Sequence, residues 1–579
     1  MRRYGPARLA GSREDAITQM ITPEFQQPPA ATLEVVPLGG VGEFGMNMMA
    51  VSFEDTTVLV DAGVMFPDPD QLGVDLIIPD LAYVESRGDK VKALVLTHGH
   101  EDHVGALPYF LREIGAPEIH ATKLTLGLVK AKLDEHGLGN AAELVEAEPE
   151  ADPVQIGPFR VQFVRMAHSI PDSVAVVLDT PGGRIVHTGD YKIDHTPVDG
   201  FRTDVGKLAT LGNEGVDLLL GDSTNAERPG VTKSERTVGE AFRQIIPRLE
   251  GRVLIASFAS NVHRVQQAID VALETDRKVC LIGRSLRKNV NIARSLGYVR
   301  VPDDLLVKPN VLAELRPEET MILCTGSQGE PMSALTRIAF RDHQHVEIQE
   351  GDTVILSAKP VPGNELRVHD TINRLAKGGA TVLHEEIAPV HTSGHGNAEE
   401  LRTILALLRP RNVMPVHGEF RMLAAHARLA REAGIPEDRI VLAENGSVVE
   451  LRGGILRLVD TLDIGSTFVD GLGVGDVRDV ALRDRRHLSE DGVLIVVVTV
   501  GSTNGRRAAA PEVIARGFSE PGPLFDEARE EVERTVTELL AQDIEELKLL
   551  QEHVHDAVGK LVYERTRRRP MILPVVVEV

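Results

Sequence analysis

Four side chains that can bind a metal ion fall within six consecutive residues of this sequence. They lie in the segment THGHEDH, which follows a predicted strand over residues 91–96, and they are His98, His100, Asp102 and His103. Imidazole and carboxylate groups suit borderline divalent ions such as zinc and manganese. Adjacent side chains diverge in a tight loop, so this one segment could serve two metal ions. The cluster therefore predicts a metal centre.

Three more candidate ligands stand at the ends of other predicted strands: His168 after FRVQFVRMA, Asp190 in HTGD and His417 in PVHGE. A single histidine at a strand end is more often a hydrogen-bonded structural residue, but the loop cluster favours metal binding here. A carboxylate between two cations can bridge them, and we assign that role to Asp190. Two ions about 3.5–4 Å apart activate water and clamp an in-line displacement at phosphorus.

A competing motif lies near the start of the chain. Residues 40–45, GVGEFG, match the dinucleotide-binding pattern G-x-G-x-x-G and follow a predicted strand. That pattern requires a helix immediately afterwards, so that the helix N-terminus faces the pyrophosphate. The next segment, 46–61, alternates in polarity and contains β-branched residues, which predicts a hairpin. We therefore interpret residues 40–45 as a structural turn.

The elements that must position these residues are short apolar runs broken by Gly and Asp, beginning at Leu33. Strands that lead into polar loops alternate with helical patterns over 104–114 and 122–135. From residue 232 onward strands and helices alternate, with helices expected over 232–249 and 262–274. This rhythm is typical of an α/β protein with a mostly parallel sheet.

The two ends of the chain have a different texture. Residues 1–31 show no sustained period and predict a mobile extension. Residues 446–480 are rich in Gly and Asp and predict a connector. The segment after it predicts strands over 493–500, 512–518 and 571–579, with helices over 523–540 and 543–564.

Composition limits the class of protein. The 579 residues are 42% hydrophobic, so a sizeable core is available and wholesale disorder is excluded. With 63 basic and 86 acidic residues the net charge is −23, which argues against a non-specific polyanion binder. Two cysteines, Cys280 and Cys324, exclude a disulfide scaffold. No apolar run approaches a membrane span and no signal peptide is evident, so we expect a cytoplasmic protein without membrane contact.

The candidate ligands, together with Asp61 in LVDAG, resemble the metallo-β-lactamase superfamily. The long stretch between Asp222 and His417 resembles the β-CASP domain that nucleases of this superfamily carry as an insertion. Asp222 in GDSTN, His395 in HTSGHG and His417 match the motifs of that group. A histidine in the last of these motifs is typical of members that cleave RNA.

Longer motifs are similar to the bacterial ribonuclease J family and extend from about residue 33 to the C-terminus. They are GGVGEFGMN, FPDPDQLGVDLIIPD, FASNVHR, GSQGEP, PGNE, HTSGHG and RRRPMILPVVVEV. Phe44 and Met46 stand where the resemblance leads us to expect Ile and Lys. Neither position is a candidate ligand.

The resemblance implies an α/β fold made of a metallo-β-lactamase αββα sandwich, an inserted β-CASP α/β domain and a small C-terminal α+β domain. The expected boundaries are an N-terminal extension (1–31), the sandwich in two parts (32–228 and 366–460), the β-CASP domain (229–365), a linker (461–489) and the C-terminal domain (490–579).

The resemblance also implies roles for the candidate site residues. One metal ion would take His98, His100 and His168, the other Asp102, His103 and His417, with Asp190 bridging. Both ions are expected to be zinc, with manganese as the alternative. Asp61 and Asp222 would hydrogen-bond ligand histidines, although Asp61 is equally suited to a plain turn. Asp102 and His395 are the candidate catalytic residues.

Substrate contacts are expected from two loops: Ser260, Asn261 and Val262, and His391, Thr392, Ser393, Gly394 and His395. Glycine lets backbone amides approach an oxyanion, and the imidazole of His395 can donate to a phosphate oxygen or to the leaving 3′-oxygen. Ser260 and Asn261 precede a predicted helix, where they could bind phosphate or serve only as an N-cap.

The resemblance implies a two-metal ribonuclease that acts 5′→3′ on single-stranded RNA with a 5′-monophosphate and also cuts internally, in RNA maturation and mRNA decay. The alternatives are a thioesterase-like small-molecule hydrolase of the same fold and a non-catalytic RNA-binding subunit of a processing complex. The expected partners are RNA, other RNA-decay proteins and further copies of the chain, joined as a dimer or higher oligomer through the C-terminal domain.

Overall fold

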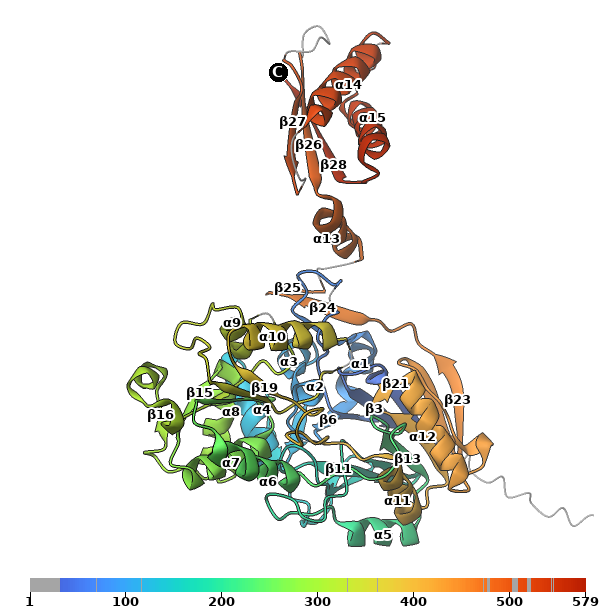
Figure 1. Cartoon of the computed structure of the whole chain (residues 1–579). Helices are drawn as coiled ribbons and strands as arrows, with labels where there is room; N and C mark the ends of the chain where they lie inside the picture. Colours follow the sequence, from blue (N-terminus) through green and yellow to red (C-terminus); the bar gives the residue numbers. More distant parts are fainter. Residues whose placement is uncertain are drawn as a thin grey trace, which may run out of the picture.

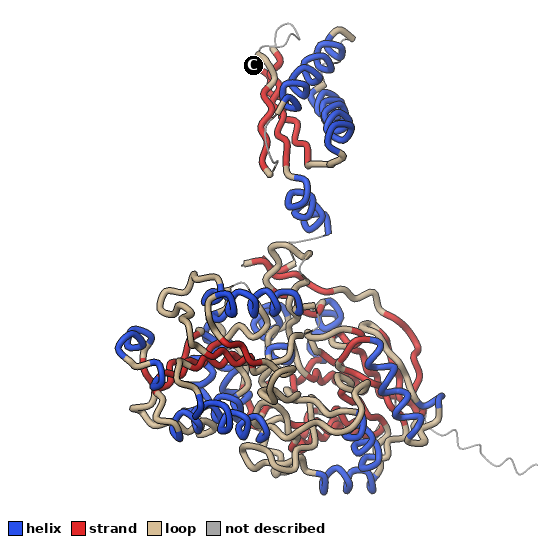
Figure 2. The backbone as a smooth tube through the Cα atoms, viewed as in Figure 1, coloured by secondary structure: helices blue, strands red, loops and turns tan. Residues whose placement is uncertain are grey.

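The computed structural model describes residues 32–579, except for 69, 116, 331, 362, 472, 476–478, 502–508, 518–521, 543 and 545. The extension expected over residues 1–31 lies outside the described residues. Figure 1 shows a large main body and, beyond helix α13 (Asp479–Asp491), a small C-terminal unit at the top of the view. Figure 2 shows that strands fill the interior of the body and helices lie toward its outside.

Two sheets form the larger half of the body. The first has the order β23-β22-β1-β3-β4-β6-β7-β8: β1 Thr32–Gly39, β3 Met48–Phe53, β4 Thr56–Val60, β6 Val91–Val95, β7 Glu118–Ala121, β8 Leu144–Glu146, β22 Ser447–Arg452 and β23 Ile455–Thr461. The second has the order β20-β13-β12-β11-β10-β9: β9 Val154–Ile156, β10 Phe159–Arg165, β11 Val174–Thr180, β12 Gly183–His187, β13 Leu218–Asp222 and β20 Asn412–Val416.

The two sheets pack face to face and are covered by helices on their outer sides. Side chains from β1, β3 and β4 share one buried cluster with side chains from β10, β11 and β13. The first sheet is covered by α1 (Ala82–Arg87), α3 (Leu107–Glu113) and α4 (Lys123–Glu135), and the second by α5 (Val205–Glu214), α11 (Ala398–Leu408) and α12 (Phe420–Glu432). This four-layer arrangement confirms the αββα sandwich.

The third sheet is entirely parallel and forms the core of the inserted domain. Its order is β16-β15-β17-β14-β18-β19: β14 Val253–Ala256, β15 Lys278–Ile282, β16 Leu306–Val307, β17 Thr320–Cys324, β18 Thr353–Leu356 and β19 Thr381–Leu383. One face is covered by α6 (Arg236–Ile245), α7 (Val262–Glu274) and α8 (Arg284–Ser295), the other by α9 (Ala334–Ala339) and α10 (Glu365–Lys377). Cys280 and Cys324 are free and buried in this core.

The inserted domain continues past residue 365, where we expected it to end. Helix α10 packs on the parallel sheet, and β19 pairs with β18 through Thr353↔Thr381 and its neighbours. Residues 366–383 therefore lie with the third sheet and not with the sandwich. The chain returns to the sandwich only with α11 and β20.

The connector expected over residues 446–480 is wrong, because most of it is strand. β22 pairs with β1 and β23 pairs with β22, which extends the first sheet of the sandwich. β24 (Ser466–Asp470) then pairs with β5 (Leu76–Pro79) and with β25 (Gly473–Val474). Glycines such as Gly453, Gly454 and Gly471 lie in the turns between these strands, whereas Asp460 and Asp470 lie within the strands themselves.

Two helices are shorter than their sequence patterns indicate. The pattern over 104–114 is divided between α2 (Glu101–Val104) and α3, and Pro108 stands in the first turn of α3. The pattern over 232–249 gives α6, which begins only at Arg236 and continues into a short 3₁₀ turn, Ile246–Arg248, that contains Pro247. Proline fits the start of a helical segment and interrupts one that is already running.

The C-terminal unit is a three-stranded sheet with two helices on one face. The strand order is β27-β26-β28: β26 Val493–Val500, β27 Glu512–Arg516 and β28 Met571–Glu578, with α14 (Pro523–Leu540) and α15 (Leu547–Thr566) packed against it. Alternate residues of β26 are buried under the helices. Within the described part of the chain, no helix combines the length and the apolar character that crossing a bilayer requires.

Candidate metal centre

The segment 97–103 runs from the end of β6 into α2 and is fixed by a second segment packed against it. The Asp102 carbonyl accepts the backbone N–H of Asn47 at 3.0 Å, and the His103 carbonyl accepts that of Ala62 at 2.7 Å. Gly63 lies so close that a Cβ there would be 1.6 Å from the Asp102 carbonyl oxygen. The turn that aims the candidate ligands is therefore held by main-chain contacts, and it requires glycine at position 63.

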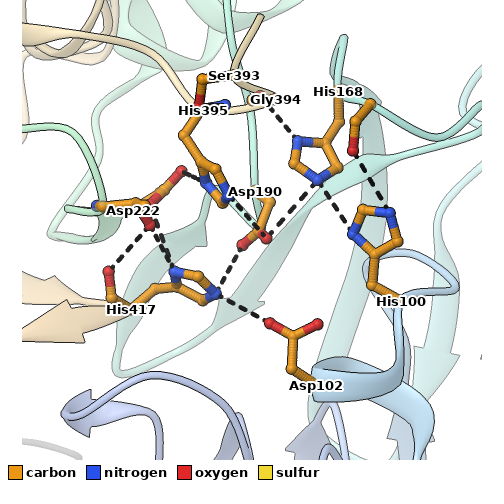
Figure 3. Close-up of polar contacts among 12 residues, drawn as sticks. His100, Asp102, His168, Asp190, Asp222, Ser393, Gly394, His395 and His417 are labelled. Atoms are coloured by element: carbon orange, nitrogen blue, oxygen red, sulfur yellow. Dashed lines mark hydrogen bonds and ion pairs between the residues drawn. The ribbon is translucent and has the colours of Figure 1, made fainter. Parts of the chain in front are cut away.

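The first group of ligand atoms consists of three imidazole nitrogens and a carboxylate oxygen. Nδ1 of His100 lies 3.0 Å from Nε2 of His98 and 3.2 Å from Nε2 of His168. Asp190 Oδ2 is 3.7 Å from His98 Nε2 and 3.8 Å from His168 Nε2. Figure 3 shows the imidazole of His168 between His100 and Asp190.

The second group of ligand atoms lies on the other side of Asp190. His103 Nε2 is 3.3 Å from Asp190 Oδ2, and His417 Nε2 is 3.4 Å from Asp190 Oδ1. Asp102 Oδ2 lies 3.5 Å and 3.6 Å from the same two nitrogens. The ligand atoms of each group lie within 4.8 Å of one another, and Asp190 belongs to both groups. The structure thus brings all seven predicted ligands together.

Hydrogen bonds fix which nitrogen of each imidazole is free. Thr97 Oγ1 donates to Asp61 Oδ2 and so accepts from Nδ1–H of His98. Nδ1 of His103 contacts Asp61 at 2.7 Å, and Nδ1 of His168 contacts the Gly394 carbonyl at 2.8 Å. Since each of these Nδ1 atoms acts as a donor, each Nε2 is left to face the centre.

His417 follows the same pattern through residues of the motif GDSTN. Thr224 Oγ1 donates to Asp222 Oδ1 and accepts from His417 Nδ1, both at 2.8 Å. The other oxygen of Asp222 accepts from His395 Nδ1 at 2.8 Å, which turns His395 Nε2 toward Asp190 at 3.9 Å (Figure 3). Asp61 therefore hydrogen-bonds a candidate ligand directly, whereas Asp222 reaches His417 through Thr224.

The donor set fits a metal ion on chemical grounds. Asp190 Oδ1 is buried and accepts no hydrogen bond, although His417 Nε2 lies 3.4 Å away. A buried acceptor without a partner is costly unless something else satisfies it. Three neutral nitrogens with a carboxylate on one side, and two nitrogens with two carboxylates on the other, are ligand sets that zinc and similar ions accept.

Electrostatics differ between the two groups. Burial lowers the pKa of His98 and of His168 well below the ordinary value, and lowers the pKa of His100 to about 4. Burial also lowers the pKa of His417, but Asp190, Asp102 and Asp222 outweigh it and raise that pKa to about 9. Burial would raise the pKa of Asp190, yet His417 and His103 hold it well below its usual range. The imidazoles of the first group are therefore neutral, whereas the second group combines carboxylates with two imidazoles of raised pKa.

Three supporting residues escaped sequence reasoning: Thr97, Thr224 and Asn47. The side-chain amide of Asn47 donates to the Asp102 carbonyl at 3.0 Å and lies 3.2 Å from His103 Nε2. Thr97 and Thr224 are neighbours of predicted residues in the motifs THGH and GDSTN, so adjacency could have suggested them. No comparable signal pointed to Asn47, which reaches Asp102 across 55 residues of sequence.

The loop 391–395 stands beside the metal groups. Ser393 Oγ accepts from Asn225 Nδ2 at 2.9 Å and from the His395 backbone at 3.1 Å. The Ser393 carbonyl accepts from the buried ammonium of Lys192 at 3.2 Å. Thr392 Oγ1 donates to the Lys233 carbonyl, and burial lowers the pKa of His391 to about 3.

The other predicted substrate loop, 260–262, lies at the N-terminus of α7. Asn261 caps that helix, since its side-chain oxygen accepts from the Arg264 N–H at 3.0 Å. Arg264 donates to the Ser357 carbonyl, and Ser357 Oγ donates to the Val390 carbonyl. The two loops are thus linked through Ser357. Val262 is buried in the core, and its side chain is not available to a ligand.

A small pocket adjoins the centre where the sandwich meets the inserted domain. Its walls include His168, Asp199 and Phe201 from the sandwich and His263 from α7. His263 Nε2 contacts Asp199 Oδ2 at 3.1 Å across this boundary. The pocket shows that space next to a candidate ligand is shared by both domains.

Comparison with family models assigns four segments of the chain. Residues 41–216 match the metallo-beta-lactamase superfamily and residues 250–375 the ribonuclease J beta-CASP domain. Residues 381–439 match the Zn-dependent metallo-hydrolase RNA specificity domain, and residues 480–579 the ribonuclease J C-terminal domain.

Full-length relatives are also similar. The chain is 42% identical over 545 residues to ribonuclease J 1 of Streptococcus pyogenes, covering 94% of this chain and 97% of that protein. It is 43% identical over 562 residues to ribonuclease J of Thermus thermophilus, covering 96% of both. A solved structure of a protein of unknown function from Enterococcus faecalis shares the fold at 16% identity, with a TM-score of 0.50 over 73% of this chain and all of that one.

Asn47 offers a test of the geometry. Asn47→Leu keeps a side chain of similar size but removes the amide that holds the Asp102 segment. Loss of such an outer partner typically weakens metal affinity about 10- to 100-fold. Competition with a chromophoric zinc chelator measures this change, with Asn213→Leu on the exposed surface of α5 as the control. Equal affinity in both variants and the parent chain would show that Asn47 does not position the ligands.

Proposed function

The chain belongs to the ribonuclease J family of metal-dependent β-CASP nucleases, and we propose that it is a two-metal enzyme that removes nucleotides from the 5′ end of RNA and also cleaves internally. The observation that carries this proposal is the position of Asp190 in both groups of ligand atoms. A single ion would need only one of these groups. RNA maturation and mRNA decay are the processes that such an activity would serve.

We assign His98, His100 and His168 to one zinc ion and Asp102, His103 and His417 to the other, with Asp190 shared. Manganese is the alternative at either position. A pair of such ions supplies an activated water and stabilises negative charge on the phosphate. The Asp102 carboxylate is 36% exposed, against 3% for Asp190, and so is the ligand best placed to accept a proton from the attacking water.

His395 is the candidate donor to the leaving group. Its Nδ1 is held by Asp222, which leaves Nε2 free on the side of the metal groups. A proton on that atom can pass to the leaving 3′-oxygen as the phosphorus–oxygen bond breaks. The products would be a 5′-phosphorylated nucleotide and a 3′-hydroxyl end.

The 5′ end of the RNA would lie between the loops 257–261 and 391–395. The first of these loops follows β14, which lies next to β18 in the parallel sheet. The chain leaves β14 toward β15 on one side and leaves β18 toward β19 on the other, so the direction of the connections reverses between these two strands. Ligands of such sheets bind beyond the carboxyl ends of the strands at this reversal. Ser260, Asn261, His391 and Ser393 would supply donors to a terminal phosphate. Val262 could contribute only its backbone, because its side chain is buried.

Metal content gives the first test. The purified chain should hold close to two divalent ions, and Asp102→Ala or His103→Ala should bind fewer and lose RNA cleavage, because each removes a ligand. Elemental analysis and cleavage of a labelled RNA are measured together. His555→Ala, on the exposed surface of α15, is the control. Full activity in a variant lacking both Asp102 and His103 would contradict the two-metal mechanism.

A second test concerns the 5′ end. Ser393 Oγ accepts two hydrogen bonds, so its own proton remains free for a phosphate oxygen. A hydrogen bond to a charged group contributes about 1.5–3 kcal/mol. Ser393→Ala should therefore reduce the preference for 5′-monophosphate over 5′-hydroxyl RNA roughly tenfold or more, while internal cleavage is nearly unchanged.

Matched RNAs that differ only in the 5′ group give this ratio, with Ser295→Ala on the exposed side of α8 as the control variant. Metal content is measured in parallel, because Ser393 also accepts from the amide of His395. Equal parental rates on 5′-monophosphate, triphosphate and hydroxyl ends, or mononucleotides released first from the 3′ end, would overturn both the pocket and the polarity.

The C-terminal unit is the proposed site of assembly into dimers or higher oligomers. Its helices cover one face of the sheet, and the opposite face carries Leu573, Val575 and Val577, each at least 41% exposed. Ile495 and Val497 of β26 pair with Leu573 and Val575 and so share this face. Apolar side chains gathered on one sheet face mark a contact surface.

Leu573→Glu with Val575→Glu should separate the oligomer into monomers, because burying two carboxylates in an apolar contact is unfavourable. Analytical ultracentrifugation of the full chain is the measurement, and Leu549→Glu on the outer side of α15 is the control. A chain that ends at residue 470 should also contain fewer copies per oligomer than the full chain. An unchanged state in both cases would contradict assembly through this unit.

A further inference from the structure

Aromatic side chains are scarce in this chain, yet one of them contacts the metal-site residue His417 and another begins the helix that follows it. The sequence has 15 Phe, 6 Tyr and no Trp. Phe420 is 53% exposed at the start of α12, three residues after His417. The ring of Phe44 is half-buried and meets the imidazole of His417 edge-on, with centroids 6.4 Å apart at 75°.

The backbone ties both phenylalanines to His417. β2 (Val41–Gly42) and β21 (Gly418–Glu419) form a short parallel ladder with Val41↔Gly418 and Gly42↔Glu419 in register. The N–H of His417 donates to the Gly40 carbonyl at 3.0 Å, which extends the ladder toward the metal groups. Phe44 and Phe420 follow the two strands at the same end of this ladder, so both are fixed relative to His417.

The segment that carries Phe44 is anchored from several sides. Asn445 Nδ2 donates to Glu43 Oε1 at 2.6 Å, and Asn445 Oδ1 accepts from the Val41 N–H at 3.1 Å. Two residues beyond the ring, the N–H of Met46 donates to the Val64 carbonyl at 2.9 Å. A ring held in place in this way loses little freedom when a flat ligand stacks on it.

The surroundings suit a nucleobase better than a phosphate. The guanidinium of Arg421, next to Phe420, pairs with the carboxylates of Glu419 and Glu227 and so is not free for an anion. Every base has a π-face that can stack on an aromatic ring. A phosphate held at the metal groups has its base one sugar away, which is within reach of a ring that touches His417.

We propose that Phe44 and Phe420 form a stacking platform for a nucleobase next to the scissile phosphate. The proposal rests on the RNA cleavage argued above and adds a subsite to it. The platform makes binding tolerant of sequence, because stacking does not read base edges. It also favours single-stranded RNA, because a paired base is not free to stack on the rings.

The test is a double-mutant cycle between the enzyme and its substrate. Phe44→Leu and Phe420→Leu keep an apolar side chain but remove the π-face. Each is assayed on 5′-monophosphate RNAs that carry one abasic nucleotide at the first, second, third or fourth position. Loss of one base stack should lower kcat/KM at least fivefold for the parent enzyme at one position. On the RNA that is abasic at that position, the variants and the parent enzyme should have the same kcat/KM, because the stacking contact is already absent.

Phe340→Leu is the matched control, because that ring is 48% exposed but faces the guanidinium of Arg374 in the inserted domain. Metal content and the rate on the abasic RNA should equal those of the parent enzyme in both variants. If the losses in kcat/KM caused by the substitution and by the missing base multiply at every position, the platform is overturned. The proposed function still stands in that case, provided that the parent enzyme cleaves normal RNA. A parent enzyme that does not cleave RNA overturns both.

Discussion

The whole arrangement depends on one buried carboxylate. Asp190 is 3% exposed and lies within 4 Å of nitrogen atoms from five histidines: His98, His103, His168, His395 and His417. A carboxylate buried in this way is strongly unfavourable unless positive charge or hydrogen-bond donors surround it. The two sheets supply four of these histidines at the ends of β6, β10 and β20, and His395 comes from the loop 391–395. Each loop is then fixed by a neighbour, so that the imidazole nitrogens point inward.

The same constraint ties the two domains together. Lys192, two residues after Asp190, is 1% exposed and holds the Ser393 carbonyl, while Glu235 lies 3.6 Å from its ammonium. Glu235 in turn binds Arg264 of α7 in the inserted domain. Because breaking a buried ion pair leaves an uncompensated charge, this chain of contacts resists separation of the domains. The loop that carries His395 is therefore positioned by both domains at once.

The sequence was sufficient to predict the ligands that lie in one short motif or at strand ends. It was insufficient for residues and strands whose partners are distant along the chain. His98 to His103 lie in one loop, and the strand-end positions of His168, Asp190 and His417 follow from the α/β rhythm. Asn47 could not be predicted, because its partner Asp102 is adjacent only after β3 and β6 have entered the same sheet. The strands of 446–480 were missed for a related reason: their pairing with β1 and β5 is long-range, while the Gly and Asp content of this stretch is local and misleading.

Acidic charge and RNA binding are compatible here because recognition is local. With a net charge of −23 the chain as a whole repels a polyanion, so long-range attraction cannot supply the affinity. Many surface arginines are already paired with carboxylates, as Arg421 is with Glu419 and Glu227. Affinity must then come from a few phosphates at the metal centre and from contacts that carry no charge. Binding of that kind depends less on ionic strength than binding by a basic groove, because fewer counterions are released.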